Sequence, residues 1–182
     1  TTFLSRPSIR FVQDGLLEHH HPPLSGVLDL RGKTSLRELV KLMYHAAGVI
    51  CPVTMHMHLC AGVETPPGRP PLRPCVVVAG GREPPHWEAY PGHRFLHTIG
   101  QLRCCQSGGC WRSRVKPLGD GDLKDQPGSL CVDVAGDLPR CMDMISAEDV
   151  VREVERFAGY WRGGGGMKKD ELGRRGLNTE KR

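Results

Sequence analysis

Aromatic residues and long apolar runs are scarce in this chain of 182 residues. Phe, Trp and Tyr make up 5% of it, and no run approaches the ~18–20 apolar residues of a membrane-spanning helix. No charged segment followed by an apolar one opens the sequence, so we expect a protein without a signal peptide, in the cytoplasm. Glycine shows no three-residue period, which excludes collagen. The length suits one ordinary domain or part of a larger enzyme.

The chain also lacks the common phosphate-binding loops and a basic stripe. Neither G-x-G-x-x-G nor G-x-x-x-x-G-K-[ST] follows any expected strand. The net charge is +5, but six basic and three acidic side chains fall in residues 163–182, which begin with four glycines. We therefore expect 163–182 to be a disordered basic tail, and we expect no specific nucleic-acid partner.

Short apolar segments alternate with helical patterns along the first half. We expect strands near 8–13, 27–30, 49–51 and 75–78, a helix starting after Ser35 and a second helix over 55–61. Ser35 and Glu38 fit a capping box. The Val run 76–78 is typical of a central parallel strand that is covered on both faces. This order predicts an α/β fold, a Rossmann-like doubly wound parallel sheet.

Ligands of such sheets bind beyond the carboxyl ends of the strands. Three loops fall at that edge, namely 31–35, 52–58 and 80–91. The helix that starts near Met55 offers backbone N–H groups and a positive dipole end to a phosphate. Thr54 adds a hydroxyl, His58 is one turn into the helix, and Lys33 carries a positive charge. Each also has an ordinary structural interpretation, as a loop or core histidine or as a solvated surface charge.

The second half of the chain differs from the first in composition and periodicity. Residues 92–145 are rich in Gly, Cys and Asp and have almost no periodicity, so we expect an irregular insert. A helix is expected over 146–162, with Asp149 completing a cap at Ser146. We therefore expect a Rossmann-like core at 1–91, a Cys-rich insert at 92–145, a helix packed on the core at 146–162 and the tail at 163–182.

Five of the eight cysteines lie in the insert. Cys105, Cys110, Cys131 and Cys141 predict a tetrathiolate site for structural zinc or iron, which spacing alone does not distinguish. Cys104 competes with Cys105 for one ligand position, and disulfides or free thiols are the alternatives. Gly108 and Gly109 would let the backbone wrap a metal before Cys110. The other three cysteines, Cys51, Cys60 and Cys75, read as small buried hydrophobes.

Three strings resemble glycosyltransferase family 9, the ADP-heptose:lipopolysaccharide heptosyltransferases of the bacterial cell envelope. Residues 30–39 resemble the family's "L-x-G-K-T-S-L-x-E-L", and 51–61 resemble "N-D-S-G-P-M-H-L-A-A". Residues 76–84 fall where the family has a strand and an "F-G-P-T" loop. The insert looks like that of the autotransporter heptosyltransferases, which carry cysteine-bound iron.

The resemblance implies the carboxy-terminal, donor-binding half of a GT-B fold. It implies an inverting glycosyltransferase that takes a nucleotide sugar of the ADP-heptose type and a saccharide or glycoprotein acceptor. The acceptor site and catalytic base would belong to an amino-terminal domain that this chain lacks, so we expect a fragment that is inactive alone and contributes no catalytic residue. The expected donor-binding residues are Lys33, Thr54, Met55, His56, Met57, His58, Gly80, Gly81 and Arg82.

The chain departs from the family at its phosphate loop. Val53 and Met55 stand where the family has an acidic residue and a glycine, and His56 stands at an apolar or Pro position. These changes affect anchoring of the sugar and the approach of backbone to phosphate. The alternative function is a metal-stapled protein-interaction module without catalysis.

Overall fold

The computed structural model describes residues 9–19 and 21–162. The chain forms two compact units, residues 1–46 and residues 47–182. The division falls inside 1–91, which the sequence predicts as one core. The expected tail at 163–182 lies outside the described residues.

The first unit contains two strands, a 3₁₀ turn and one helix. Strands β1 (Val12–Gln13) and β2 (Leu28–Asp29) pair in parallel, η1 spans Leu17–His19, and α1 spans Leu36–His45. The predicted capping box is confirmed: the Ser35 N–H donates to Glu38 Oε2 at 2.8 Å, and the Glu38 N–H donates to Ser35 Oγ at 3.3 Å. These bonds satisfy two backbone donors at the helix start and so fix where α1 begins.

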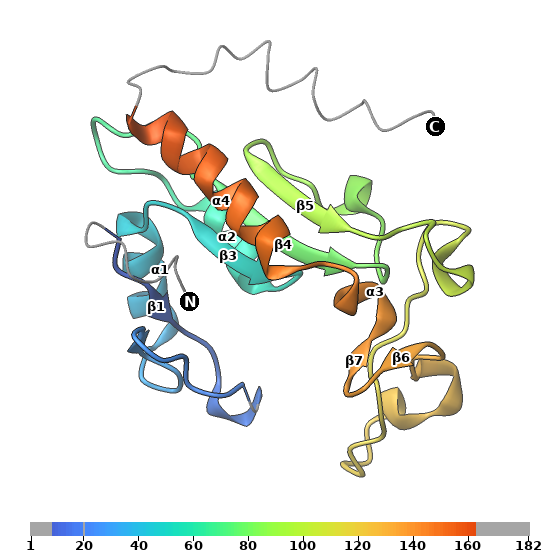
Figure 1. The fold of residues 1–182 in the computed structure, drawn as a ribbon. Coiled ribbons are helices and arrows are strands. Elements are labelled where there is room, and N and C mark those ends of the chain that lie inside the picture. The colour runs from blue at the N-terminus through green and yellow to red at the C-terminus, as the bar shows by residue number, and fades with distance from the viewer. Residues whose placement is uncertain (1–8, 20, 163–182) are drawn as a thin grey trace. The chain divides into compact units, whose positions relative to one another are not determined.

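The second unit is built on a parallel sheet of order β3-β4-β5 (Figure 1). Its strands are β3 (Val49–Pro52), β4 (Cys75–Gly80) and β5 (His93–His97), and α2 (Met55–Gly62) connects β3 to β4. α2 packs against β3 and β4, and α4 (Ala147–Arg162) packs on the other face against β4 and β5. The protein is therefore mixed α/β, and β4 is the covered central strand that its Val run predicts.

The core of this unit lies on both faces of the sheet, because successive side chains of β4 alternate between the α2 side and the α4 side. Met57, Cys75 and Val77 are fully buried, and Cys60 and Val76 are 1% exposed. The burial predicted for the cysteines in and beside these strands is confirmed. None of the helices in the described ranges combines the length and apolar character needed to cross a bilayer.

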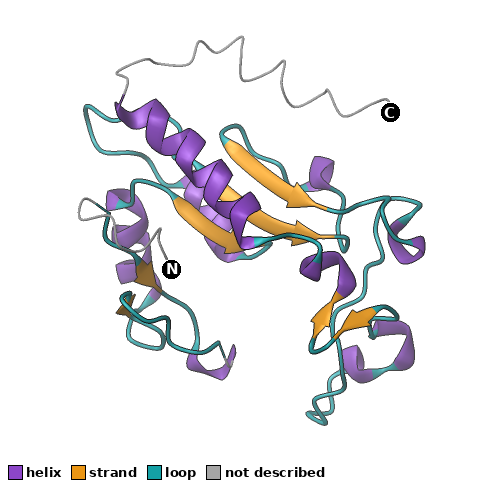
Figure 2. Ribbon diagram, in the orientation of Figure 1, coloured by secondary structure: helices purple, strands orange, loops and turns teal. Residues whose placement is uncertain are grey.

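The prediction that 92–145 has almost no regular structure is wrong in part (Figure 2). His93–His97 forms β5, because its backbone pairs with β4, although polar side chains at 93, 94 and 97 hide the strand in the sequence. The insert also holds an antiparallel pair, short 3₁₀ turns and one helical turn. These elements are η3 (Arg103–Cys105), η4 (Leu123–Asp125), η5 (Pro127–Ser129), β6 (Val134–Ala135), β7 (Leu138–Pro139) and α3 (Arg140–Asp143).

The last helix begins where the sequence predicts. The Ser146 N–H donates to Asp149 Oδ2 at 2.9 Å, and the Asp149 N–H donates to Ser146 Oγ at 3.1 Å. The shorter Asp side chain thus completes the cap in place of Glu.

Candidate metal centre and sheet edge

A cavity of about 210 Å³ lies where the carboxyl edge of the sheet meets the insert. Its sheet side is lined by Pro52 at the end of β3 and Val53 after it, by Val78 and Ala79 in β4, and by Arg82 after β4. Because β3 and β4 are parallel, the segments that follow them emerge at the same edge. The insert covers this edge.

Four cysteines line the insert side of the cavity, namely Cys104, Cys110, Cys131 and Cys141. Burial raises the pKa of the Cys104 and Cys141 thiols, and the charges of neighbouring cysteines raise both further. A divalent cation would reverse this balance, because a coordinated thiol is deprotonated outright. The donor set therefore fits a soft or borderline ion such as zinc or iron.

Cys105, which the sequence predicts as a ligand, is not among the residues that line the cavity. It is completely buried, and its thiol donates to the carbonyl oxygens of Thr98 and Leu102, both at 3.4 Å. Cys104, the sequence's open alternative, lines the cavity instead. A single 3₁₀ turn, Arg103–Cys105, sends the two adjacent side chains to different places.

The glycine pair before Cys110 turns the insert back toward the sheet. Gly108 has φ +114° and Gly109 has φ +150°, values that L side chains rarely adopt. Beyond this turn the Cys110 N–H donates to the Gly81 carbonyl and the Trp111 N–H to the Arg82 carbonyl, both at 3.1 Å. The two bonds attach the insert to the loop after β4.

Aromatic rings pack at the same junction. Trp87 from the loop after β4 and Trp111 from the insert have ring centroids 4.8 Å apart and planes tilted by 57°. Both rings are largely exposed, at 66% and 46%. Trp111 holds φ +57° although it is not a glycine, and its bond to Arg82 stabilises that conformation.

Charged side chains on the cavity wall are tied into the protein. Arg114 forms a two-bond pair with Asp120, with Nη–Oδ distances of 2.8 and 2.7 Å, and also contacts Asp125. Arg114 thereby lowers the pKa of Asp120 to about 2. Arg112 donates to the Leu130 carbonyl at 2.6 Å. These arginines hold the insert together, because their donors face its own backbone and carboxylates.

The residues of the predicted phosphate-binding loop differ in how far they are buried. Thr54, Met55 and His58 are exposed at the start of α2, whereas Met57 is fully buried and His56 is half-buried. The Thr54 side chain makes no capping hydrogen bond, although its hydroxyl lies 3.4 Å from the Pro52 carbonyl oxygen. The Met57 side chain therefore belongs to the core, and its backbone N–H donates to the Thr54 carbonyl at 3.0 Å.

His58 connects α2 to the segment before β5. Its Nδ1 lies 2.8 Å from the Tyr90 hydroxyl, and the two rings meet edge to face with centroids 5.7 Å apart. This contact orients the imidazole on the exposed side of α2.

The other predicted donor-binding residues have different surroundings. Cβ atoms added at Gly80 and Gly81 would lie 2.7 Å from Met142 Sδ and 3.2 Å from Cys105 Sγ, respectively, so the insert covers both glycines. Arg82 donates through Nε to the Arg112 carbonyl at 3.0 Å and pairs with Glu83. Lys33 belongs to the unit of residues 1–46, where its Nζ donates to the Asp29 carbonyl at 2.8 Å.

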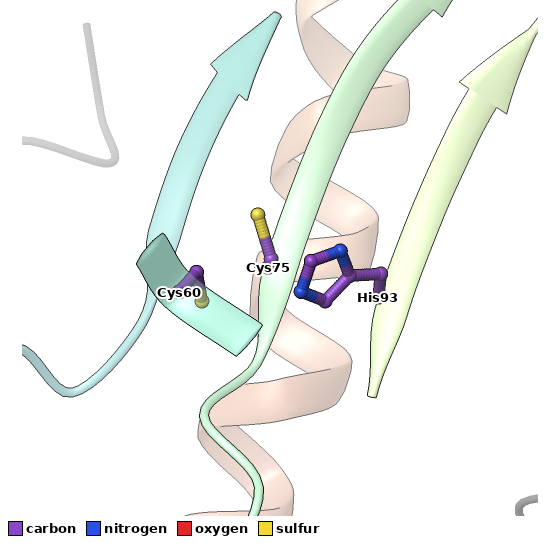
Figure 3. Close-up of side chains that lie close together, drawn as sticks. All are labelled: Cys60, Cys75 and His93. Carbon is purple, nitrogen blue, oxygen red and sulfur yellow. The ribbon is translucent and has the colours of Figure 1, made fainter. Parts of the chain in front are cut away.

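Sequence analysis missed a second cluster of metal-ligating side chains, formed by Cys60, Cys75 and His93 (Figure 3). Their ligand atoms all lie within 4.8 Å of one another, which holds for no other such group in the described ranges. No three of the four cavity cysteines meet this spacing. The Cys75 S–H lowers the pKa of Cys60 to about 6 by hydrogen bonding to its thiolate, whereas neighbouring thiols and burial raise the pKa of Cys75.

Comparison of the chain with models of protein families, with curated proteins and with solved structures finds no match.

Proposed function

We propose that the chain is the donor-binding part of an inverting glycosyltransferase, with a metal-stapled insert that shapes the donor edge of its sheet. The donor is a nucleotide diphosphate sugar of the ADP-heptose class, and the acceptor is a saccharide or glycoprotein. The proposal places no catalytic base among the described residues. It assigns the sheet to the carboxy-terminal half of a GT-B fold.

The meeting of the segments after β3 and β4 at one edge carries this proposal. Pro52, Val53 and Arg82 line the same cavity, and β3 and β4 are adjacent and parallel. Nucleotides bind at this edge in open α/β sheets, where the crossover segments leave a crevice. The arrangement of the strands thus supports a nucleotide site at this edge but does not distinguish one sugar from another.

The start of α2 is the surface that suits the diphosphate. Backbone N–H groups at a helix start point out of the helix and carry partial positive charge. The third of them, that of Met57, donates to the Thr54 carbonyl at 3.0 Å. Thr54 and His58 are exposed beside them, and Tyr90 orients His58. As the sugar leaves the donor, charge builds on the departing diphosphate, and donors held in place would stabilise it.

The cavity itself suits a metal better than a nucleotide. Its volume of about 210 Å³ is below the ~300–1,000 Å³ of most ligand pockets. We assign the ion to Cys104, Cys110, Cys131 and Cys141, with Cys105 as a buried structural thiol. The ion would order an insert that has little apolar core of its own.

Titration of the full chain with ADP-, UDP- and GDP-sugars tests the proposal. Saturable binding is expected, strongest for an ADP-linked sugar. The double variant Thr54→Ala/His58→Ala should weaken it about tenfold or more, because two polar contacts to a charged group are lost. Thr65→Ala is the matched control, since it deletes a hydroxyl that bonds the Pro70 carbonyl in the loop after α2.

Two results would count against the proposal. An absence of saturable binding by every nucleotide sugar, in protein that retains its metal, favours the interaction-module alternative. Equal binding by Thr65→Ala and the double variant would remove the site from the start of α2. The metal assignment has its own test: Cys104→Ser should release the ion, whereas Cys105→Ser should retain it.

A further inference from the structure

A second set of thiols lies at the opposite, amino-terminal edge of the sheet. Cys60 is in the last turns of α2, and Cys75 and His93 are the first residues of β4 and β5. Cys75 and His93 are direct partners in the parallel register, so they lie side by side. Figure 3 shows the three side chains gathered between α2 and the strands, with α4 behind the sheet.

The imidazole of His93 is the unusual member of this cluster. Both of its ring nitrogens are shielded from solvent, and neither has a hydrogen-bond partner. A neutral imidazole carries one donor and one acceptor, and leaving both unmet in a protein interior is costly. A ligated ion would satisfy one nitrogen directly. Cys60 and Cys75 beside it are 1% and 0% exposed, so water does not compete.

The Cys51 thiol lies at a distance from the Cys75 thiol that suits a fourth ligand. The Cys51 and Cys75 Sγ atoms are 3.7 Å apart. Zn–S bonds of about 2.3 Å at tetrahedral angles separate two sulfurs by about 3.8 Å. The contacts of the Cys60 thiol with backbone oxygens are long, 3.6 Å to the Arg73 carbonyl and 3.8 Å to that of Pro74. Cys60, Cys75 and His93 thus form one compact group, and the Cys51 thiol lies beside its Cys75 member.

The charges also suit a cation with thiolate ligands. Zn²⁺ with two thiolates and a neutral imidazole is neutral, and a third thiolate leaves one negative charge. Arg73 is 2% exposed, and its Nη1 donates to the Cys60 carbonyl at 3.2 Å. Its guanidinium places a positive charge beside the cluster and offsets the extra thiolate.

We propose that Cys60, Cys75 and His93 bind a structural Zn²⁺, with Cys51 as the fourth ligand. Each ligating thiol releases its proton to solvent as the Zn–S bond forms. The ion joins α2 to all three strands of the sheet. It is independent of the metal in the insert and of any nucleotide site.

The test compares two substitutions in one strand of the full chain. His93→Phe keeps a ring and removes the ligand, and His97→Phe is the control at the other end of β5. Zinc is counted by elemental analysis, and unfolding midpoints are measured with and without a chelator. We expect His93→Phe to hold about one Zn²⁺ fewer per chain than His97→Phe, and to unfold at a lower midpoint that a chelator no longer shifts.

If no metal is bound, His93→Phe should change the stability in the opposite direction. Replacing two unsatisfied buried nitrogens by carbon would leave stability unchanged or raised. Unchanged zinc with equal or higher stability in His93→Phe would therefore overturn the proposal. A disulfide mapped among Cys51, Cys60 and Cys75 in freshly denatured protein would overturn it too, because oxidised cysteines cannot ligate the ion.

A measurement on the unmodified chain covers the case in which His93→Phe fails to fold. X-ray absorption at the zinc edge should show sulfur with a minor nitrogen component, since one site supplies an imidazole. A shell of sulfur alone would refute ligation by His93.

Discussion

Gly109→Ala should detach the insert from the sheet, whereas Gly108→Ala should leave it attached. A Cβ at 109 would lie 2.7 Å from the Arg82 carbonyl oxygen, a backbone atom that cannot turn aside. A Cβ at 108 would meet nothing within 4 Å. Both positions have positive φ, so the pair separates the cost of backbone strain from the cost of crowding.

The magnitudes follow from these two terms. Strain at a position that favours glycine costs roughly 1–3 kcal/mol and applies to both variants. Crowding in a packed region adds about 1–3 kcal/mol and applies to Gly109→Ala alone. We therefore expect Gly109→Ala to be the less stable variant by about 1–3 kcal/mol. It should also lose metal, because Cys110 follows directly and its N–H bonds the Gly81 carbonyl.

Urea unfolding followed by tryptophan fluorescence measures the difference, and elemental analysis of the two purified variants measures the metal. Free energies of unfolding that agree within about 0.5 kcal/mol would refute the reasoning, since differences of that size are within ordinary scatter. Equal metal content would show that the contact with Arg82 does not position Cys110.

Three further results are expected. Arg114 lowers the pKa of Asp120 from its ordinary 3.8 to about 2, so the ionised Asp120 stabilises the insert at pH values above 3.8. Amide protection from hydrogen exchange over 113–131 should therefore fall as the pH drops from 3.8 toward 2. Arg114→Gln should lose this protection already at neutral pH. Met57→Ala should cost about 2–5 kcal/mol in urea unfolding, against little for exposed Met55→Ala. Ser35→Ala should cost about 0.5–2 kcal/mol by the same measurement in a peptide or the full chain.

Elements with a strong local signal were predictable from the sequence. The capping residues Ser35 and Ser146 fix where their helices begin, and the Val run 76–78 identifies the central strand. In each case the information lies within a few neighbouring residues. A backbone donor and a side-chain acceptor three positions apart suffice for a cap.

β5 and the Cys60–Cys75–His93 cluster were not predictable in this way. His93–His97 carries polar side chains, and it becomes a strand because β4 offers it a parallel partner. Cys60 and Cys75 have the burial expected of small hydrophobes, yet the imidazole between them comes from another strand. Similarly, the choice between Cys104 and Cys105 depends on one 3₁₀ turn. Tertiary pairing decides the first two, whereas the third depends on a local turn.

The indoles of Trp87 and Trp111 give the insert an optical reporter of its own. Their centroids are 4.8 Å apart and their planes are tilted by 57°, so the electronic transitions of the two rings are coupled and chirally oriented. Such a pair produces a circular dichroism couplet that depends on its mutual geometry. Loss of the couplet, with the sheet signal unchanged, would record release of the insert in unlabelled protein and in real time.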